Sequence, residues 1–464
     1  MAGGNVKKGF GTYLFILLFM ILLAFLLVVV IMILSPSKNI LGFKYFANRK
    51  NYSITTTSAE EEINYSALTE LNLNTDYAEI IIERDRKVDT PQLRVEVSTY
   101  GFAKEKDNTD FSYEVNFVES DNARLNVKLN EPQGFLYLQK NIKVRYLLPV
   151  TTATSLENTQ INVVNNSGRL YLGNAADLQT EYSTTNFKSV NFKTNSGTLY
   201  INKFVGENVN ELFFKSEKGG IQNSNTLTIQ NRLEVYSTSG NIKLGKINYS
   251  GTDAIKFDLK NAKLSASEIN GNVDLEIDSG YVDIDKLNGN LSSSDALSQM
   301  NKATINIKEV AGNISLPYAN SSTLHFGKIA DEKQVYINGT NGNITIDEMN
   351  GGCWIETQKG NVNVNTNSND IWVKTTTGKI NVKYNNNDIL DSLNFISQKG
   401  EVNLRVKPEL KFILKALNSK GELRGSANIK IEFYDKTFSN PLVINNGTKY
   451  INMTTNGRIY IGLI

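Results

Sequence analysis

Residues 336–384 read YINGTNGNITIDEMNGGCWIETQKGNVNVNTNSNDIWVKTTTGKINVKY, and this stretch decides the fold. One five-residue pattern occurs in it three times at intervals of eighteen residues, as Gly342-Asn-Ile-Thr-Ile, Gly360-Asn-Val-Asn-Val and Gly378-Lys-Ile-Asn-Val. Each copy is a glycine followed by aliphatic residues at the second and fourth positions after it. This alternation predicts a short strand that places its aliphatic side chains on one face and is entered through a tight glycine turn.

The same pattern extends over most of the chain. It recurs at Gly168, Gly197, Gly240, Gly271, Gly280, Gly312, Gly400 and Gly457. An apolar residue usually stands five positions before the glycine, and a serine or threonine three positions before it. No such unit can bury its apolar face alone, so the repetition predicts stacked rungs. We therefore expect an all-β fold, a single-stranded β-solenoid over residues 151–464, with a β-sandwich of hairpins as the alternative.

An apolar segment precedes the repeats. Residues 14–34 read LFILLFMILLAFLLVVVIMIL without a charge, and 21 residues at about 1.5 Å each span about 31 Å of bilayer. No small-residue cleavage site follows, which favours a transmembrane signal anchor over a cleaved signal peptide. Lysines flank both ends, but the short tail and the repeats favour a cytoplasmic tail over residues 1–13. We expect a single-pass protein of the cell membrane with its C-terminal domain extracytoplasmic.

Two segments lie between the helix and the repeats. Residues 35–69 are polar and weakly patterned, which predicts a linker or stalk. Longer alternating runs such as QLRVEVSTY and ARLNVKLN follow and predict strands up to residue 150. A bare first rung would expose unpaired strand groups. We therefore expect residues 70–150 to form a β-rich module that caps the solenoid.

The composition excludes several kinds of chemistry. The formal net charge of +2 contains no basic block, so nothing indicates a nucleic-acid partner. Cys353 and His325 are the only cysteine and the only histidine, which excludes a cysteine zinc site and leaves little for nucleophilic catalysis. The glycines are accounted for by turns rather than by a phosphate loop. We expect no enzymatic activity and no cofactor.

Four segments are LNLNTDYAEIIIERD (71–85), YLLPV (146–150), FKTNSGTLYI (192–201) and TTNGRIYIGLI (454–464). At these residues the chain resembles a bacterial adhesin-like family, a widespread domain of unknown biochemistry. The resemblance covers residues 70–464 and rests on repetition rather than on any invariant residue. It implies a β-solenoid at a cell envelope and brings no catalytic residues with it.

Aromatic residues form the best candidate binding feature. Tyr336, Trp354 and Trp372 are spaced at eighteen, each six residues before a rung glycine. Their neighbours take the inward parity, so the three rings are expected to project outward, one above another, about 4.8 Å apart. Such a strip suits the faces of sugar rings or extended polymers, and the alternative is that a loop packs over it. Tyr171 and Tyr200 form a second, weaker pair.

A second candidate feature is acidic. In residues 271–289, GNVDLEIDSGYVDIDKLNG, the aliphatic residues are expected to face inward. Asp274, Glu276, Asp278, Asp283 and Asp285 would then face outward together. Carboxylate clusters of this kind can bind Ca²⁺, and paired carboxylates can perform acid/base chemistry on polysaccharides. A solvated acidic face is the simpler alternative.

These features predict a membrane-anchored, cell-surface adhesin-like or envelope-structural protein. It would bind glycans, envelope polymers or surface proteins through repeated contacts along its stacked strands. The alternative is a carbohydrate-active β-helix enzyme, a lyase or glycosidase that uses the acidic residues. A third possibility is an envelope signalling component, which would need a cytoplasmic partner because the tail is short.

Overall fold

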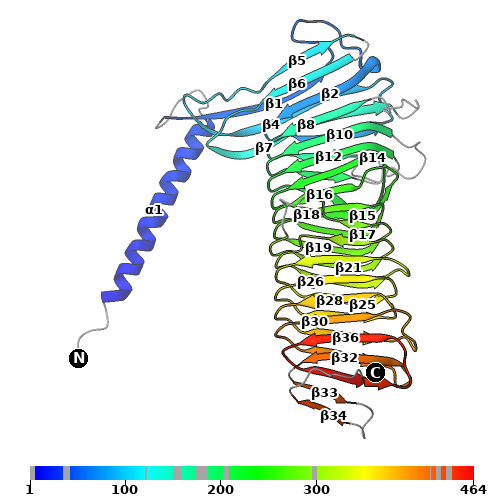
Figure 1. Cartoon of the computed structure of the whole chain (residues 1–464). Helices are drawn as coiled ribbons and strands as arrows, with labels where there is room; N and C mark the ends of the chain where they lie inside the picture. The colour runs from blue at the N-terminus through cyan, green and yellow to red at the C-terminus, as the bar shows by residue number, and fades with distance from the viewer. Residues whose placement is uncertain are drawn as a thin grey trace.

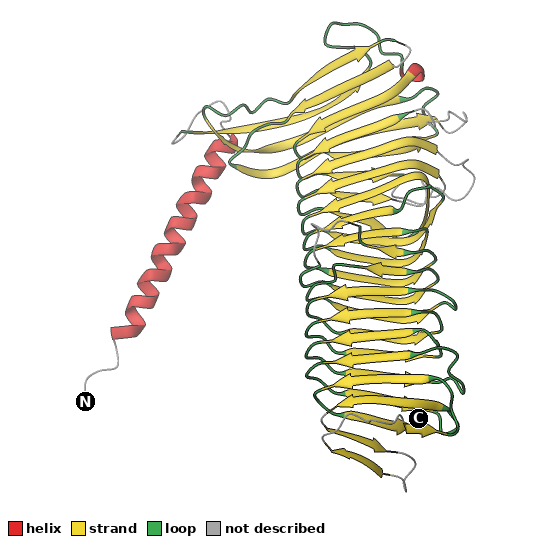
Figure 2. Ribbon diagram, viewed as in Figure 1, coloured by secondary structure: helices red, strands yellow, loops and turns green. Residues whose placement is uncertain are grey.

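A computed structural model describes residues 6–34, 42–120, 123–149, 159–173, 186–201, 208–294, 300–418, 420–424, 430–434 and 442–464. It contains a helix, α1 (Val6–Leu34), and a tall column of short strands that rise rung by rung (Figure 1). Figure 2 shows that the column consists almost entirely of strands and turns, with α1 standing apart from it. The prediction of an all-β solenoid preceded by one apolar helix is confirmed for the described residues.

The strands form two stacks, and most rungs contribute one strand to each. The long strand Thr226–Ser237 bridges the stacks, because its first four residues pair with the strand Asn241–Tyr249 of the second stack while its last four pair within the first. Most neighbours within a stack are parallel, while the strands that close its two ends are antiparallel. In hydrogen-bonded order the first stack contains β5 (Ser112–Val118), β6 (Ala123–Asn130), β2 (Leu68–Thr75), β8 (Gln160–Asn165), β10 (Asn186–Thr194), β12 (Asn208–Ser216), β14 (Thr226–Ser237), β16 (Ile255–Leu259), β18 (Val273–Ile277), β20 (Leu291–Ser292), β22 (Ile314–Leu316), β24 (Val335–Gly339), β26 (Cys353–Thr357), β28 (Ile371–Thr375), β30 (Leu393–Ser397), β36 (Tyr450–Thr455), β32 (Phe412–Asn418) and β35 (Leu442–Ile444).

The second stack runs beside the first, and its ends are likewise antiparallel. The short helix η1 (Tyr65–Ala67) leads into β2 of the first stack. In hydrogen-bonded order the second stack contains β1 (Phe43–Ile54), β4 (Gln92–Lys104), β7 (Leu136–Pro149), β3 (Glu79–Asp85), β9 (Arg169–Leu172), β11 (Thr198–Ile201), β13 (Gly220–Asn223), β15 (Asn241–Tyr249), β17 (Lys263–Asn270), β19 (Tyr281–Leu287), β21 (Thr304–Val310), β23 (Thr323–Ile329), β25 (Ile344–Met349), β27 (Val362–Thr366), β29 (Ile380–Tyr384), β31 (Val402–Val406), β37 (Ile459–Leu463), β33 (Lys420–Arg424) and β34 (Lys430–Tyr434).

The core lies between the stacks. It consists of columns of inward side chains, in which residues at the same position of successive rungs lie one above another. Ile337, Ile355, Val373 and Phe395 follow one another in register on β24, β26, β28 and β30. All four are fully buried. Each side chain therefore packs on the residues directly above and below it, as well as on the facing stack. This arrangement explains why the aliphatic pattern is needed in every rung.

The corner that leads into the second stack explains the Ser/Thr-x-x-Gly signature. The Gly400 N–H donates to Ser397 Oγ at 2.9 Å, and that hydroxyl donates to the Gly378 carbonyl of the rung before it at 3.0 Å. Thr375 and Gly378 make the same internal bond at 3.0 Å. One buried hydroxyl thus satisfies a turn N–H and links two rungs.

The glycine pattern serves two corners rather than one. Gly280 precedes β19 in the second stack, whereas Gly271 and Gly312 precede β18 and β22 in the first. At this other corner an asparagine follows each glycine, and Asn272 accepts from the Asn290 N–H at 3.0 Å and Asn290 from the Asn313 N–H at 2.8 Å. Consecutive copies of the pattern can therefore lie on opposite faces of the solenoid.

The N-terminal part differs from the expected stalk. Residues 35–41 lie outside the described residues, but β1 pairs with β4 along its whole length. Ile54, Ile63 and Leu68 are buried in the core. The sequence FKYFANRKNYSI is polar, so its strand was not recognised. It is an edge strand with one face toward solvent, and such a strand does not need a regular alternation of apolar residues. β2 and β3 pair in parallel with β8 and β9, so the capping strands and the repeats form continuous stacks.

One column on the second stack consists of alternating charges. Six residues follow one another in register over β15, β17, β19, β21, β23 and β25: Lys246, Glu268, Lys286, Glu309, Lys328 and Glu348. Lys246 and Glu268 are 3.1 Å apart, and Lys328 and Glu348 3.5 Å. Each pair of opposite charges on directly neighbouring strands stabilises the pairing of these strands by about 0.2–1 kcal/mol.

Cys353 faces the core from β26, and its burial predicts an unreactive thiol. Removal from water, with a smaller contribution from Asp370, raises the pKa of Cys353 to about 12. Because only the thiolate is nucleophilic, we expect no alkylation of the folded protein at pH 8 and rapid alkylation in urea. Mass spectrometry after iodoacetamide treatment measures both. Full modification of the folded protein at pH 8 would show that this thiol is exposed.

Candidate functional site

Tyr336, Trp354 and Trp372 form an aromatic ladder on the first stack. The three residues are register partners on β24, β26 and β28. Ring centroids lie 4.7 and 4.6 Å apart, with interplanar angles of 10° and 5°. Tyr336 is 38% exposed and the two tryptophans are half-buried. The expected outward parity is thus observed, and the rings stack on one another at the spacing of the strands.

Stacking determines what the aromatic ladder can offer to a ligand. Parallel rings at this separation cover most of one another's faces. What remains open is the row of ring edges and the outer faces of Tyr336 and Trp372. The next register positions are Ser315 above and Asn394 below, neither of which carries a ring. The ladder therefore suits an extended ligand that lies along the solenoid axis better than a single sugar clamped between rings.

An ion pair flanks the aromatic ladder. Lys374 lies two residues after Trp372 on the same outward face, and its Nζ is 2.6 Å from Glu356 and 5.9 Å from the centre of the Trp372 ring. This pair holds the lysine beside the indole. A ligand on the aromatic ladder would consequently find a hydrogen-bond donor and an acceptor at its margin.

Tyr171 and Tyr200 stack in the same manner but on the other stack. They are register partners on β9 and β11, with centroids 4.7 Å apart and planes within 10°. The Arg169 guanidinium donates to the Tyr171 hydroxyl at 3.4 Å, a contact that raises the pKa of Arg169. The two groups of aromatic residues predicted from the sequence therefore lie on opposite stacks and do not form one surface.

The five acidic candidates do not face outward together, because β18 and β19 belong to different stacks. In the first stack, Glu276 is buried and pairs with Lys256 at 3.4 Å, and Asp274 accepts from Ser294 at 2.6 Å. In the second, Lys308 lies 2.5 Å from Asp285 and Asn306 donates to Asp283 at 2.8 Å. Asp278 accepts from Asn301 at the corner between them. Within the described part of the chain no group of three or more His, Cys, Asp and Glu is placed to hold a metal ion.

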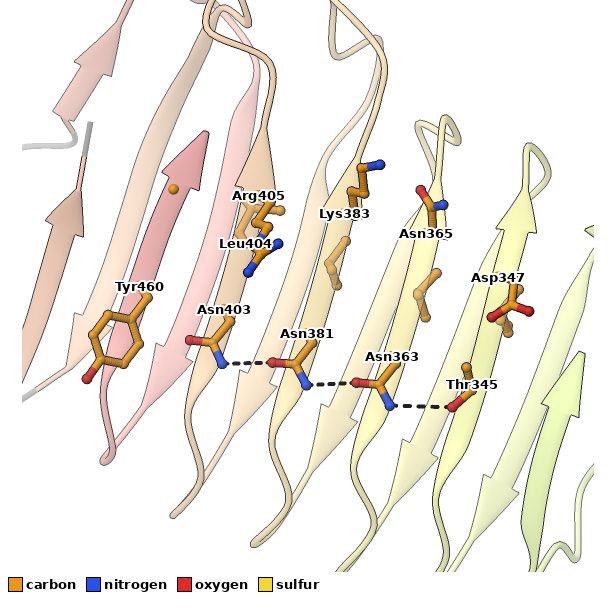
Figure 3. Close-up of a pocket in the computed structure, with 14 residues that line it drawn as sticks. Thr345, Asp347, Asn363, Asn365, Asn381, Lys383, Asn403, Leu404, Arg405 and Tyr460 are labelled. Atoms are coloured by element: carbon orange, nitrogen blue, oxygen red, sulfur yellow. Dashed lines mark hydrogen bonds between the residues drawn. The ribbon is translucent and has the colours of Figure 1, made fainter. Parts of the chain in front are cut away.

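A groove on the second stack was not expected from the sequence. It crosses β25, β27, β29, β31 and β37 and has a volume of about 600 Å³. Its floor is a row of side-chain amides: Asn403 donates to Asn381 at 2.8 Å, Asn381 to Asn363 at 2.7 Å, and Asn363 to Thr345 at 3.4 Å (Figure 3). Because each amide carries two N–H groups, one remains per rung for a ligand. We call this row the amide ladder.

A second column along the groove carries charge. Asn365, Lys383 and Arg405 are register partners on β27, β29 and β31, and Gly462 continues the column with open space beside it. Lys383 and Arg405 are exposed, and among the described residues no carboxylate lies within ion-pair distance of either. Asp347, at the far end of the groove, already bonds His325 at 2.7 Å. The groove thus combines repeated amide donors with two free cations.

A regular offset in the sequence could have revealed this groove. Thr345, Asn363, Asn381, Asn403 and Tyr460 each stand three positions after a rung glycine, and Asp347, Asn365, Lys383, Arg405 and Gly462 each stand five positions after one. Outward positions that share an offset form a column once the rungs stack. Asparagine is so frequent in this chain that composition concealed the column.

The geometry defines a class of protein, a two-faced β-solenoid that presents side-chain ladders. Comparison with known proteins gives its family: the profile of the Toastrack DUF4097 family matches residues 68–347 and 283–456. The chain therefore belongs to this family, and the resemblance stated from the sequence is confirmed. No curated protein matches the chain.

Several solved structures are similar over most of their length. A proposed cell adhesion protein from Clostridium sporogenes is 8% identical, with a TM-score of 0.18 and coverage of 90% of this chain and 100% of its own. A proposed lipid-binding protein from Parabacteroides distasonis is 15% identical, with a TM-score of 0.20 and coverage of 77% and 96%. A proposed adhesin from Bacteroides fragilis is 10% identical, with a TM-score of 0.16 and coverage of 90% and 97%. Likenesses this distant carry no argument about function.

Proposed function

We propose that this chain is a membrane-anchored, adhesin-like envelope protein that contacts extended polymers along its solenoid. The observation that carries the proposal is the aromatic ladder, in which three stacked rings stand partly exposed on the outer face of the first stack. Large aromatic side chains are enriched where proteins make contacts and are seldom left on a surface without one.

The anchor in this proposal is α1. Residues Tyr13–Ile31 form a helical stretch of mean hydropathy 3.6 with none of it buried in the protein, long and apolar enough to cross a membrane. A bilayer would cover this surface. The solenoid would then stand on the extracytoplasmic side, with residues 1–13 in the cytoplasm, as the short tail favours.

The proposed mechanism is the summation of weak contacts. Successive rungs are one strand spacing apart. A polymer aligned with the solenoid axis would therefore meet one ring edge or one free amide N–H at each rung of a ladder. The aromatic ladder and the amide ladder face opposite directions, which gives the chain two such surfaces. The chemistry of rings, amides and two cations fits glycans, including acidic ones. Catalysis is not part of this proposal, because the candidate carboxylates lie on separate stacks.

Tryptophan fluorescence tests the proposal directly, because Trp354 and Trp372 are the only tryptophans of the chain. We expect a saturable change in emission when the full chain, held in lipid nanodiscs, is titrated with envelope polysaccharides. In a folded Trp354→Ala/Trp372→Ala variant, calorimetry is expected to show affinity about 10- to 30-fold lower, since each lost ring contributes about 1 kcal/mol.

A matched control uses the aromatic pair on the other stack. Tyr171→Ala/Tyr200→Ala also removes two stacked rings, but it leaves the aromatic ladder intact. We expect this variant to bind as the parent does. Equal affinity of the parent and the tryptophan variant for every polymer tested would refute a role for the ladder.

A further inference from the structure

An antiparallel arm projects from the N-terminal end of the solenoid. It is made of β1, β4 and the first part of β7, and Figure 1 shows it reaching sideways to the upper end of α1. The residues at the outer end of the arm are apolar, and several of them are exposed. Phe135 is 65% exposed, Leu136 40% and Leu138 47%, while Phe43 and Tyr45 are half-buried beside them. We call these five residues the arm tip.

The arm tip is an ordered part of the sheet. Phe43 and Phe135 lie 5.3 Å apart and Tyr45 lies 5.7 Å from Phe102, measured between ring centroids. The Phe135 N–H donates to the Phe102 carbonyl at 2.8 Å, which fixes the loop onto β4. The apolar side chains are therefore held outward by backbone pairing and ring contacts, and they do not fold back onto the core.

Such clustering is unusual on this molecule. Outside α1, the other large apolar side chains that the structure describes as exposed are scattered along the chain: Tyr77, Val118, Val164, Tyr281, Tyr336, Leu390, Val443 and Ile464. At the arm tip, three of the four residues 135–138 are exposed and aliphatic or aromatic. A contiguous exposed apolar patch marks a place where the protein meets something else.

Chain continuity places the arm tip close to the membrane. The Gly42 carbonyl accepts from the Glu105 N–H at 3.0 Å, so Gly42 is fastened to the end of β4 beside Phe43. Only eight peptide steps separate Gly42 from Leu34, the last residue of α1. Eight steps of at most about 3.6 Å cover no more than about 29 Å. Gly42 therefore lies within that distance of the end of α1, and Phe43, the first residue of the arm tip, follows it directly.

We propose that the arm tip docks into the interfacial layer of the same bilayer that holds α1, which rests on the anchor proposed above. Phenylalanine, tyrosine and leucine side chains are those that insert at the boundary between headgroups and acyl chains. Lys44, Lys104 and Lys106 lie at the same end and suit headgroup phosphates, with Glu105 and Asp107 partly offsetting them. A second contact beside the helix fixes the direction in which the solenoid leaves the membrane.

A second copy of the chain is the competing occupant. β1 has its outer edge unpaired in the described structure, so strand addition is the obvious route to a dimer. However, Arg49 and Lys50 stand exposed in the middle of this strand. Charged side chains on an edge strand oppose pairing with another sheet. The bilayer is therefore the favoured occupant.

Site-specific quenching by lipids tests the docking. The variant Phe135→Cys is labelled with an environment-sensitive fluorophore and the full chain is placed in nanodiscs of phosphatidylcholine with or without a doxyl-labelled lipid. Cys353 is buried and stays unlabelled. The matched control is Leu390→Cys, because Leu390 is 69% exposed and lies far along the solenoid. We expect at least threefold greater quenching at residue 135 than at residue 390.

Each outcome has a distinct meaning. Equal quenching at the two positions, in nanodiscs that contain the chain, overturns the docking and leaves the anchor standing. Failure of the chain to elute with nanodiscs overturns the anchor, and the docking with it. Low lipid quenching at 135 together with protection from iodide would mean that a second copy covers the arm tip. A label at Leu138→Cys, expected to behave as residue 135 does, guards against a local defect of one variant.

Discussion

Gly378→Ala is expected to destabilise the folded protein by about 3 kcal/mol or more. A Cβ at this position would overlap the Gly360 carbonyl oxygen of the previous rung and would lie 2.6 Å from its carbon. Both are backbone atoms, so no rotamer change can relieve the overlap, and the cost should exceed that of ordinary overpacking, about 1–3 kcal/mol. Urea unfolding followed by tryptophan emission measures the loss of stability, because Trp372 lies on β28, the strand that leads into this turn.

Gly462→Ala is the matched control. Gly462 lies in β37, and nothing lies within 4 Å of a Cβ built there. We expect its urea midpoint to change little. If both variants unfolded at the parent midpoint, the stacked turn would be able to move apart, and the close approach of neighbouring glycines would not be a constraint on the fold.

Phe395→Ala is expected to cost about 3–5 kcal/mol, the range for truncating a buried phenylalanine. Phe395 is fully buried in the core column, with Val373 above it and Met453 below it in register. The neighbours are held at the strand spacing by backbone hydrogen bonds, so the cavity cannot collapse along the axis. Thermal unfolding monitored by far-ultraviolet circular dichroism measures the effect.

The adjacent residue provides the comparison. Ile396→Ala removes a similar apolar group one position later, but Ile396 faces outward and is only half-buried. We expect it to cost about 1 kcal/mol or less. Comparable losses from the two variants would contradict the inward and outward assignment of β30.

Much of the fold was predictable because a single repeat unit contains the pattern of inward and outward residues that all rungs share. The alternation around Ile355 and Val373 gives the inward face, and the spacing of eighteen gives the stacking, so the parity of Trp354 and Trp372 follows without the structure. The glycine pattern could not reveal which corner it served. Gly271 and Gly280 open segments of the same pattern, GNVDL and GYVDI, yet one leads into the first stack and the other into the second. That ambiguity is why Asp274 and Asp283 were expected on one face and lie on two.

The candidate surfaces were predictable only in part. The aromatic ladder is visible in the sequence because tryptophan is rare and its spacing is conspicuous. The amide ladder was missed although Asn363, Asn381 and Asn403 share one offset from their rung glycines, because asparagine is too frequent in this chain for that spacing to stand out. The arm tip could not be predicted either: Phe135 and Leu136 look like core residues in a linear pattern, and only the lateral extension of β7 beyond the stacks leaves them uncovered.

The column of alternating charges limits how this molecule can change in length. If one rung were lost between Lys246 and Glu348, two lysines or two glutamates would become direct neighbours, and like charges on adjacent strands repel. Loss of two consecutive rungs restores the alternation. Insertions and deletions in this section are therefore tolerated best in even numbers, and the same parity opposes folding errors in which a single rung is skipped.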